Sequence, residues 1–181
     1  MSDAVLSLAG FEEDAIADGP GLRAVVFVQG CPHHCPGCHN PQTWSFSGGT
    51  RVAVEGVARR ILRNPLTTGV TFSGGEPFAQ AGALAALAER LGGKYELAVY
   101  TGYTFETLLA LAAENGAVAR LLAAADVLVD GPFRLEERDR RLLWRGSRNQ
   151  RLLDAKASLA AGKAVLTRDP DWTGEAASAA S

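Results

Sequence analysis

Residues 23–38 read RAVVFVQGCPHHCPGC, and this stretch both decides the fold and locates the chemistry. Its first half, Arg23–Gln29, is rich in Val and Phe, a composition that predicts a buried β-strand. Its second half contains Cys31, Cys35 and Cys38, which are all the cysteines of the chain. A cysteine cluster directly after a buried strand predicts a metal or redox site at the carboxyl end of that strand.

The cysteine spacing is C-x3-C-x2-C, which places three thiols in one short loop. An odd number of cysteines so close together makes a poor disulfide framework. Thiolates are soft ligands that suit iron–sulfur clusters and zinc. A cubane cluster normally takes four cysteines, so three would leave one iron open to a substrate or cofactor. The residues alone also allow a structural zinc site completed by His33, His34 or His39, or a disulfide with one free thiol.

Outward from this segment, apolar runs alternate with Ala/Leu-rich segments of helical spacing. Strands separated by helices indicate βα units, an α/β fold and a parallel sheet. Thr104 is expected to cap the helix formed by the LLALAAE run. The other expected strands are Val70–Ser73, Glu96–Tyr100, Asp126–Val129 and Ala164–Thr167, and the other expected helices are Val52–Arg63, Phe78–Leu91, Val118–Ala125 and Leu152–Ala160.

The unusual sequences of the chain follow the expected strands. The cysteines follow the first strand, Ser73–Pro77 (SGGEP) the second, Thr101–Tyr103 the third and Asp130–Phe133 the fourth. Proteins with parallel sheets place their chemistry at the carboxyl ends of the strands. We therefore expect these four segments to share one site.

The composition is that of an ordinary globular protein of 181 residues, of which 47% are apolar and 21% charged. A net charge of −2 gives no basic footprint for nucleic acid. No apolar run is long enough to span a bilayer, and the N-terminus lacks a secretory pattern, so we expect a cytoplasmic protein that binds neither nucleic acid nor membrane. We expect one domain over residues 1–172 and a disordered Ala/Ser-rich tail over residues 173–181.

A cysteine loop of this spacing after one strand, followed by a Gly-Gly-Glu loop after the next, resembles the radical S-adenosylmethionine (SAM) superfamily. The resemblance implies a 4Fe–4S cluster held by the three cysteines, with SAM chelating the open iron through its amino and carboxylate groups. It also implies that Gly74, Gly75 and Glu76 bind the methionine amino group of SAM. The superfamily uses an incomplete, open (β/α) barrel, which suits a chain shorter than the about 250 residues of a closed eight-stranded barrel.

Four further segments narrow the resemblance: DGPGLR at 18–23, YTGY at 100–103, DVLVDGPF at 126–133 and WRGSRNQ at 144–150. This ordered set resembles the anaerobic ribonucleoside-triphosphate reductase activating proteins. The resemblance implies that an electron from the cluster cleaves SAM, and that the resulting 5′-deoxyadenosyl radical takes a hydrogen from a glycine of the large catalytic subunit of the reductase. A one-electron donor such as reduced flavodoxin is the expected reductant.

Other interpretations fit parts of the sequence. Within the same chemistry, the chain could activate a different glycyl-radical enzyme, or act on a small molecule. Outside that chemistry, it could be a zinc-stabilised binding module without catalysis, or an electron-transfer protein that uses the cluster alone. Metal and sulfide analysis and an assay for SAM cleavage separate these interpretations.

The remaining candidate site residues flank these motifs. The resemblance implies that Asp130 lies near SAM, whereas the Lys that relatives carry two positions later is Pro132 here. Thr101 is expected either to contact the carboxylate or ribose of SAM or to cap its strand. His39 and Asn40, directly after the third cysteine, are expected to contribute to the SAM site.

A last group of expectations concerns the surface around the site. We expect His33 and His34 to face solvent and Trp44 to pack the cysteine loop onto the barrel. Arg145 is expected to order the SAM site or the partner surface. The basic stretch Arg138–Arg151 either receives the glycine loop of the partner or forms a solvated face.

Overall fold

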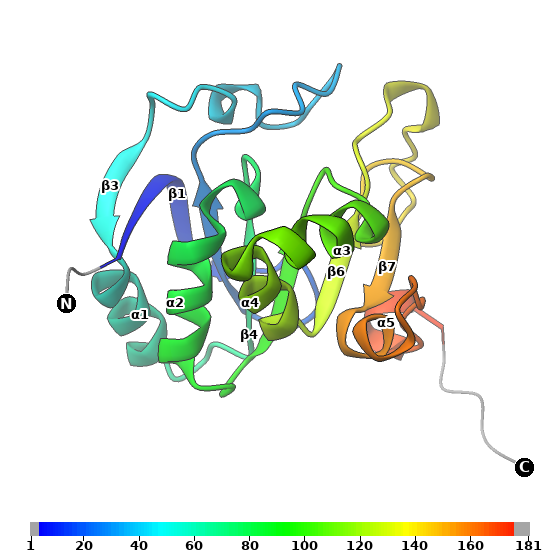
Figure 1. Ribbon diagram of the computed structural model, residues 1–181. Coiled ribbons are helices and arrows are strands. Elements are labelled where there is room, and N and C mark those ends of the chain that lie inside the picture. The colour runs from blue at the N-terminus through cyan, green and yellow to red at the C-terminus, as the bar shows by residue number, and fades with distance from the viewer. Residues whose placement is uncertain (1–3, 176–181) are drawn as a thin grey trace, which may run out of the picture.

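A computed structural model describes residues 4–175 and shows an open sheet of seven strands with most of its helices packed on one face (Figure 1). The strand order across the sheet is β3-β1-β2-β4-β5-β6-β7, so β3 and β7 form its two edges. The strands are β1 (Val5–Ala15), β2 (Arg23–Val28), β3 (Thr50–Ala53), β4 (Gly69–Gly74), β5 (Glu96–Tyr100), β6 (Val127–Asp130) and β7 (Arg151–Asp154).

Four neighbouring strands, β2, β4, β5 and β6, run parallel and form the centre of the sheet. Parallel strands need long crossover connections, which the helices supply. The α-helices are α1 (Val54–Arg63), α2 (Ala81–Leu91), α3 (Phe105–Glu114), α4 (Gly116–Ala124), α5 (Ala155–Ala161) and α6 (Pro170–Thr173), and the 3-10 turns are η1 (Pro41–Thr43), η2 (Pro77–Gln80) and η3 (Leu135–Glu137).

Helices α1, α2, α4 and α3 lie side by side over one face of the sheet (Figure 1). In α1, Val54, Val57, Ala58 and Ile61 recur at helical spacing and are buried against this face. Each fully buried aliphatic side chain of this kind contributes roughly 1.5–3 kcal/mol, so the layer forms the main core. Within residues 4–175, no helix is long and apolar enough to cross a membrane.

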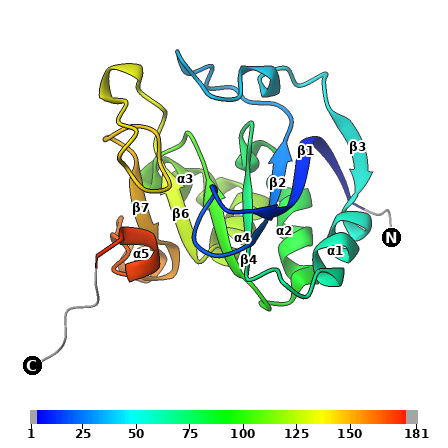
Figure 2. The same cartoon turned by 180° about the vertical axis from the view of Figure 1, so that it is seen from behind.

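The opposite face, which the segment between β1 and β2 crosses in Figure 2, carries a smaller core around Trp172 of α6. Trp172 is fully buried against Ala98 and Val129, and its indole N–H donates to the Glu96 carboxylate at 3.2 Å. The Arg23 guanidinium lies 5.5 Å from the Trp172 ring centre and donates to Glu96 Oε1 at 2.9 Å. The arginine of the DGPGLR segment is therefore a buried link within the fold.

The expected α/β class with an open, mostly parallel sheet is confirmed. Three strands add to that expectation, because β1, β3 and β7 pair antiparallel with their neighbours and extend the sheet on both sides. Strand β1 escaped the sequence analysis because its alternation breaks where the pairing with β2 shifts register, between Leu8 and Gly10.

The helix expected over Leu152–Ala160 starts later than predicted. Its first residues belong to β7, where Leu152 and Leu153 pair with β6 and become buried. Asp154 ends the strand, and its carboxylate accepts a hydrogen bond from the Ala157 amide at 2.8 Å. This contact caps α5, so the helical pattern was correct only from Ala155 onward.

The C-terminal segment also differs from expectation. The expected strand Ala164–Thr167 is reduced to one bridge, between Leu153 and Leu166. Of the tail expected over residues 173–181, Thr173 ends α6, and residues 176–181 lie outside the described residues.

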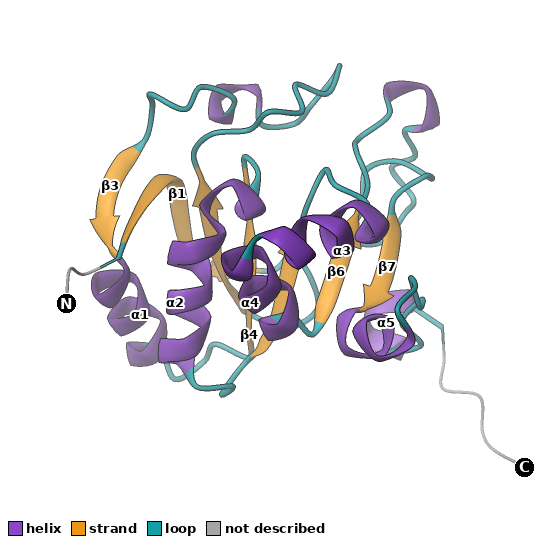
Figure 3. Cartoon of the chain, in the orientation of Figure 1, coloured by secondary structure: helices purple, strands orange, loops and turns teal. Residues whose placement is uncertain are grey.

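Loops gather at the carboxyl ends of the four parallel strands (Figure 3). Two of them rise beyond the sheet. One is the cysteine loop, residues 30–49, which follows β2, and the other is the basic loop, residues 131–150, which joins β6 to β7. Both loops border a cavity at these strand ends.

Candidate active site

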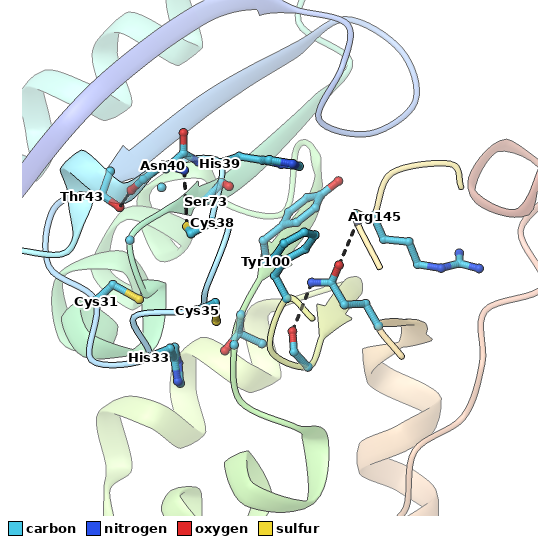
Figure 4. Close-up of a pocket in the computed structure, with 18 of the residues that line it drawn as sticks. Cys31, His33, Cys35, Cys38, His39, Asn40, Thr43, Ser73, Tyr100 and Arg145 are labelled. Carbon is cyan, nitrogen blue, oxygen red and sulfur yellow. Dashed lines mark hydrogen bonds between the residues drawn. The ribbon is translucent and has the colours of Figure 1, made fainter. Parts of the chain in front are cut away.

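A cavity of about 370 Å³ lies at the carboxyl ends of β2, β4, β5 and β6. Its walls come from the cysteine loop, the basic loop and the strand ends between them (Figure 4). The structure therefore brings together the four segments that the sequence places after strands. The candidate site residues that line the cavity are Cys31, Cys35, Cys38, His39, Asn40, Gly74, Gly75 and Thr101.

The three thiols face the cavity from the cysteine loop (Figure 4). Cys31 is buried, Cys35 and Cys38 are half-buried, and all three are free, so the structure contains none of the disulfides considered above. The loop is tightly wound, because the Cys38 amide donates to the Cys35 carbonyl at 3.0 Å and the Asn40 amide donates to Cys38 Sγ at 3.4 Å. Such folding turns three nearby thiols toward one space.

Burial disfavours the ionised form of two of the three thiols. Burial raises the pKa of the Cys31 thiol, and burial also raises the pKa of the Cys35 thiol. A metal overcomes this cost, because a coordinating thiol is deprotonated outright.

A glycine pair lets the end of β4 lie directly against the start of the cysteine loop. The Gly75 amide donates to the Val28 carbonyl at 2.8 Å, and the Glu76 amide donates to the Gly30 carbonyl at 2.9 Å. A Cβ atom at Gly75 would lie 2.3 Å from that Gly30 oxygen, so only glycine fits. Gly74 and Gly75 thus line the cavity and also pack closely against the backbone of Val28 and Gly30.

The carboxylate of Glu76 is fully buried and forms hydrogen bonds with four groups of the protein. It accepts hydrogen bonds from the amides of Phe78 (3.0 Å) and Gly102 (2.9 Å) and from the Thr101 hydroxyl (2.9 Å). His33 Nε2 lies 2.7 Å from Glu76 Oε2. Glu76 is not among the described residues that line the cavity, and it connects the cysteine loop to the ends of β4 and β5.

The expectation that His33 faces solvent was wrong. Its side chain is only 17% exposed, because it bonds to Glu76 and its ring stacks edge-on against Tyr103 at 4.5 Å between centres. His34 is exposed, as expected, and its ring lies 4.9 Å from that of Trp44. A buried carboxylate such as that of Glu76 needs hydrogen-bonding partners. That need was the only indication in the sequence that a nearby histidine such as His33 would be buried.

Asp130 is the last residue of β6, but it does not line the cavity. Its fully buried carboxylate accepts from the Phe105 amide at 2.7 Å and from Arg151 Nη2 at 2.5 Å. Arg151 also bonds Glu106 at 2.8 Å, and this hydrogen bond lowers the pKa of Glu106. Asp130 therefore fixes α3 and β7 around the end of β6, while its neighbour Gly131 lines the cavity.

Sequence reasoning missed several polar residues of the cavity, among them Asp18 and Tyr100. Burial raises the pKa of the Asp18 carboxyl, and burial raises the pKa of the Tyr100 phenol as well. Figure 4 shows Tyr100 between the cysteine loop and Arg145, whose side chain extends away from the thiols. Both residues belong to quoted segments, DGPGLR and YTGY, but only the folded chain shows that these segments meet.

Most of the chain is similar to known proteins. Residues 17–153 match a family model described as a 4Fe-4S single cluster domain. An anaerobic ribonucleoside-triphosphate reductase-activating protein of Vibrio cholerae serotype O1 is 38% identical over 145 residues, covering 75% of this chain and 89% of the relative. The protein of the same name from Escherichia coli K12 is 33% identical over 145 residues, covering 75% and 90%.

Two further similarities are more limited. A pyruvate formate-lyase-activating enzyme of Clostridium pasteurianum is 45% identical over 74 residues, which are 38% of this chain and 31% of that enzyme. Among solved structures, QueE from Escherichia coli superposes with a TM-score of 0.44 at 17% identity, covering 55% of this chain and 53% of that one.

Proposed function

The chain belongs to the anaerobic ribonucleoside-triphosphate reductase-activating proteins, which makes it a radical SAM activating enzyme of a glycyl-radical enzyme, and we propose how its residues carry out that function. The observation that carries the proposal is the arrangement of three free thiols around a cavity at the ends of four parallel strands. The family match spans residues 17–153, so it includes the cysteine loop, the glycine pair and the basic loop.

Cys31, Cys35 and Cys38 are the residues that would hold the 4Fe–4S cluster. The donor set supports this assignment, because three soft ligands on a short loop leave one iron free for SAM. When bound, the cluster supplies the electron that cleaves SAM, and the radical so released takes a hydrogen atom from a glycine of the reductase. The protein's own task is to place these groups and to keep solvent away from them.

The residues that line the cavity next to the thiols would contact SAM. Gly74 and Gly75 offer backbone groups, while Thr101 and Asn40 offer polar side chains. Glu76 and Asp130 would act from behind this wall, because their buried carboxylates already accept hydrogen bonds from protein donors. We therefore assign SAM contact to the lining residues, and support of the wall to the two acids.

The cavity also needs closure against water, since a carbon radical reacts with whatever lies near it. The cysteine loop and the basic loop meet on one side, where the His39 ring lies 5.3 Å from the Phe133 ring. The open sheet leaves the remaining side free for a macromolecular substrate. A glycine of the large reductase subunit would enter there, and reduced flavodoxin is the proposed electron donor in the cytoplasm.

A second candidate partner is another glycyl-radical enzyme. The local similarity to a pyruvate formate-lyase-activating enzyme favours this alternative, but that match covers 38% of the chain against 75% for the reductase-activating proteins. The family model of a 4Fe-4S single cluster domain, which matches residues 17–153, includes the WRGSRNQ segment. The reductase is therefore the preferred partner.

The experiment that tests the proposal starts with anaerobic reconstitution, followed by iron and sulfide analysis. Dithionite and SAM should then yield 5′-deoxyadenosine, and addition of the large reductase subunit should yield a glycyl radical visible by electron paramagnetic resonance. Cys35→Ala is the control that should abolish both signals. Zinc without iron, or an intact cluster that forms no 5′-deoxyadenosine, would overturn the proposal.

A further inference from the structure

The mouth of the cavity is bordered by two loops of very different charge. The cysteine loop contains no Asp, Glu, Lys or Arg. The basic loop contains six arginines and three acidic residues, a net charge of +3, which leaves −5 for the rest of a chain whose total is −2. Positive charge is therefore concentrated in the loop on one side of the opening.

Several of these arginines are free to meet a partner. Arg138 and Arg140 are exposed, and neither forms an ion pair within residues 4–175. Arg134 pairs with Glu137 inside the loop, and Arg141 and Arg148 share Asp139. Ion pairs inside the loop thus engage two of its three acids, Glu137 and Asp139, and leave Arg138 and Arg140 exposed.

The basic loop is held in one shape by its own polar side chains. Gln150 Oε1 accepts from the amides of Gly146 (2.9 Å) and Ser147 (3.1 Å), and Asn149 Nδ2 donates to the Pro132 carbonyl at 2.7 Å. The fully buried Ser147 hydroxyl donates to Asn149 Oδ1 at 2.7 Å. The G-S-x-N-Q part of the WRGSRNQ segment therefore builds a rigid base, and a rigid base fixes where the arginines stand.

The loop is also fixed to the site. A Cβ at Gly37, at the tip of the cysteine loop, would lie 2.9 Å from Leu135, so the two loops touch at this point. Leu135 remains half exposed, and Phe46 of the cysteine loop is 63% exposed. The two loops that border the cavity therefore combine exposed apolar side chains with exposed arginines, as expected of a surface that binds polypeptide.

We propose that the basic loop is the docking surface for acidic polypeptide next to the substrate glycine of the reductase. This inference rests on the proposed function, because the glycine has to reach the cavity that the loop borders. Charge complementarity favours an acidic segment, since Arg138 and Arg140 have no acid of their own. Rim charges of this kind speed association and set its salt dependence more than they change the chemistry.

The test compares Arg138→Glu/Arg140→Glu with Arg63→Glu/Lys94→Glu in reconstituted holoenzyme. Both double variants change the net charge equally, and Arg63 and Lys94 are exposed residues that precede β4 and β5, at the opposite end of these parallel strands from the cavity. With dithionite as reductant, 5′-deoxyadenosine formation without reductase should be unchanged in both. Glycyl-radical formation at low reductase concentration should fall about 10-fold in the first variant only, with a weaker dependence on salt.

Equal activation rates in the two variants would overturn the inference. So would a loss seen only when reduced flavodoxin replaces dithionite, because the loop would then serve the electron donor.

A second arm measures binding of two fluorescent peptides, each with a central glycine, flanked either by Asp and Glu or by Lys. The unmodified holoenzyme should prefer the acidic peptide, and Arg138→Glu/Arg140→Glu should remove that preference. Absence of preference, or tighter binding of a single-stranded oligonucleotide, would overturn the docking surface. Should the unmodified enzyme cleave SAM but leave the reductase without a radical, the assigned reductase would fail, while the peptide arm still decides the role of the loop.

Discussion

The cysteine loop and the basic loop border one cavity, yet they are built in opposite ways. The cysteine loop contains no Asp, Glu, Lys or Arg but holds all three histidines of the chain. Besides its internal turns, it is held from outside by the glycine pair and Glu76. The basic loop carries nine charged residues and is braced mainly from within, by Ser147, Asn149 and Gln150. The first depends on a close fit to the sheet, whereas the second keeps its own shape.

This difference suggests a division of labour. A loop that holds a reactive group gains from a dry, neutral surrounding fixed to rigid strands. A loop that meets a partner gains from exposed charge on a preformed base. Mutations in the two loops and their supports should therefore act on different properties.

The largest effect is expected from Cys31→Ala, because the cluster would lose one of its three ligands. Iron content and 5′-deoxyadenosine formation should both fall to background after anaerobic reconstitution. His34→Ala, an exposed change in the same loop, should leave both near the level of the unmodified enzyme. Full iron content in Cys31→Ala would contradict the assignment of this thiol.

Next in size is Glu76→Gln, which removes the external anchor of the cysteine loop. The amide cannot satisfy the donors that converge on the buried carboxylate, and each unsatisfied donor costs about 1–3 kcal/mol. We expect the free energy of unfolding of the metal-free protein to drop by about 3 kcal/mol. Glu89→Gln, at an exposed ion pair, should cost no more than about 1 kcal/mol. Equal denaturation midpoints for the two variants would show that Glu76 is not an anchor.

Gly75→Ala tests the close fit between β4 and the cysteine loop. Its Cβ would meet the Gly30 carbonyl, a backbone atom that cannot move alone, so we expect a loss of about 1–3 kcal/mol. Gly116→Ala is the matched change, since nothing lies within 4 Å of its Cβ position in α4. That variant should be stabilised by about 0.5–1 kcal/mol in urea denaturation. A stable Gly75→Ala protein would show that the loop can shift away from the strand.

A smaller effect is expected from Asn149→Ala, which opens the brace of the basic loop. The side chain makes two hydrogen bonds of 2.7 Å, to Pro132 and Ser147, and their loss should cost about 1 kcal/mol. Amide hydrogen exchange should rise within residues 131–150 and stay unchanged in residues 30–49. Exchange that rises equally in both loops would contradict their independence.

The smallest effect concerns pH. Hydrogen bonds from Arg141 hold the pKa of Asp139 well below its usual range. A carboxyl with a lowered folded pKa contributes stability above its unfolded pKa and loses it as pH falls through the folded value. The Arg141 amide, which donates to Asp139 Oδ1 at 3.1 Å, should therefore show an NMR titration midpoint below the ordinary Asp value of about 3.9. A midpoint at the ordinary value would mean that the ion pair does not form in solution. The cysteine loop, which has no acid, should not titrate in this range.

The sequence alone determined the chemistry and the general fold. Three soft ligands at C-x3-C-x2-C spacing and a glycine pair at the next strand end are local patterns, and βα alternation is a periodic one. Such patterns are visible because the residues that make them lie close together in the chain. Buried parallel strands can also be recognised from the sequence, because they are apolar along their whole length.

Only the tertiary structure decided which residues support the site and which border its opening. Glu76 lies 43 positions from His33, and Asp130 lies 21 positions from Arg151, so no local pattern joins them. The strands β1 and β7 escaped detection because pairing with neighbours, not intrinsic preference, makes them strands. The arginines of the basic loop were visible in the sequence as a charged run, but the sequence does not show which part of the molecule such a run lies beside. Its position beside the three cysteines is set by the pairing of β6 with β7 and by contacts such as that of the His39 ring with the Phe133 ring.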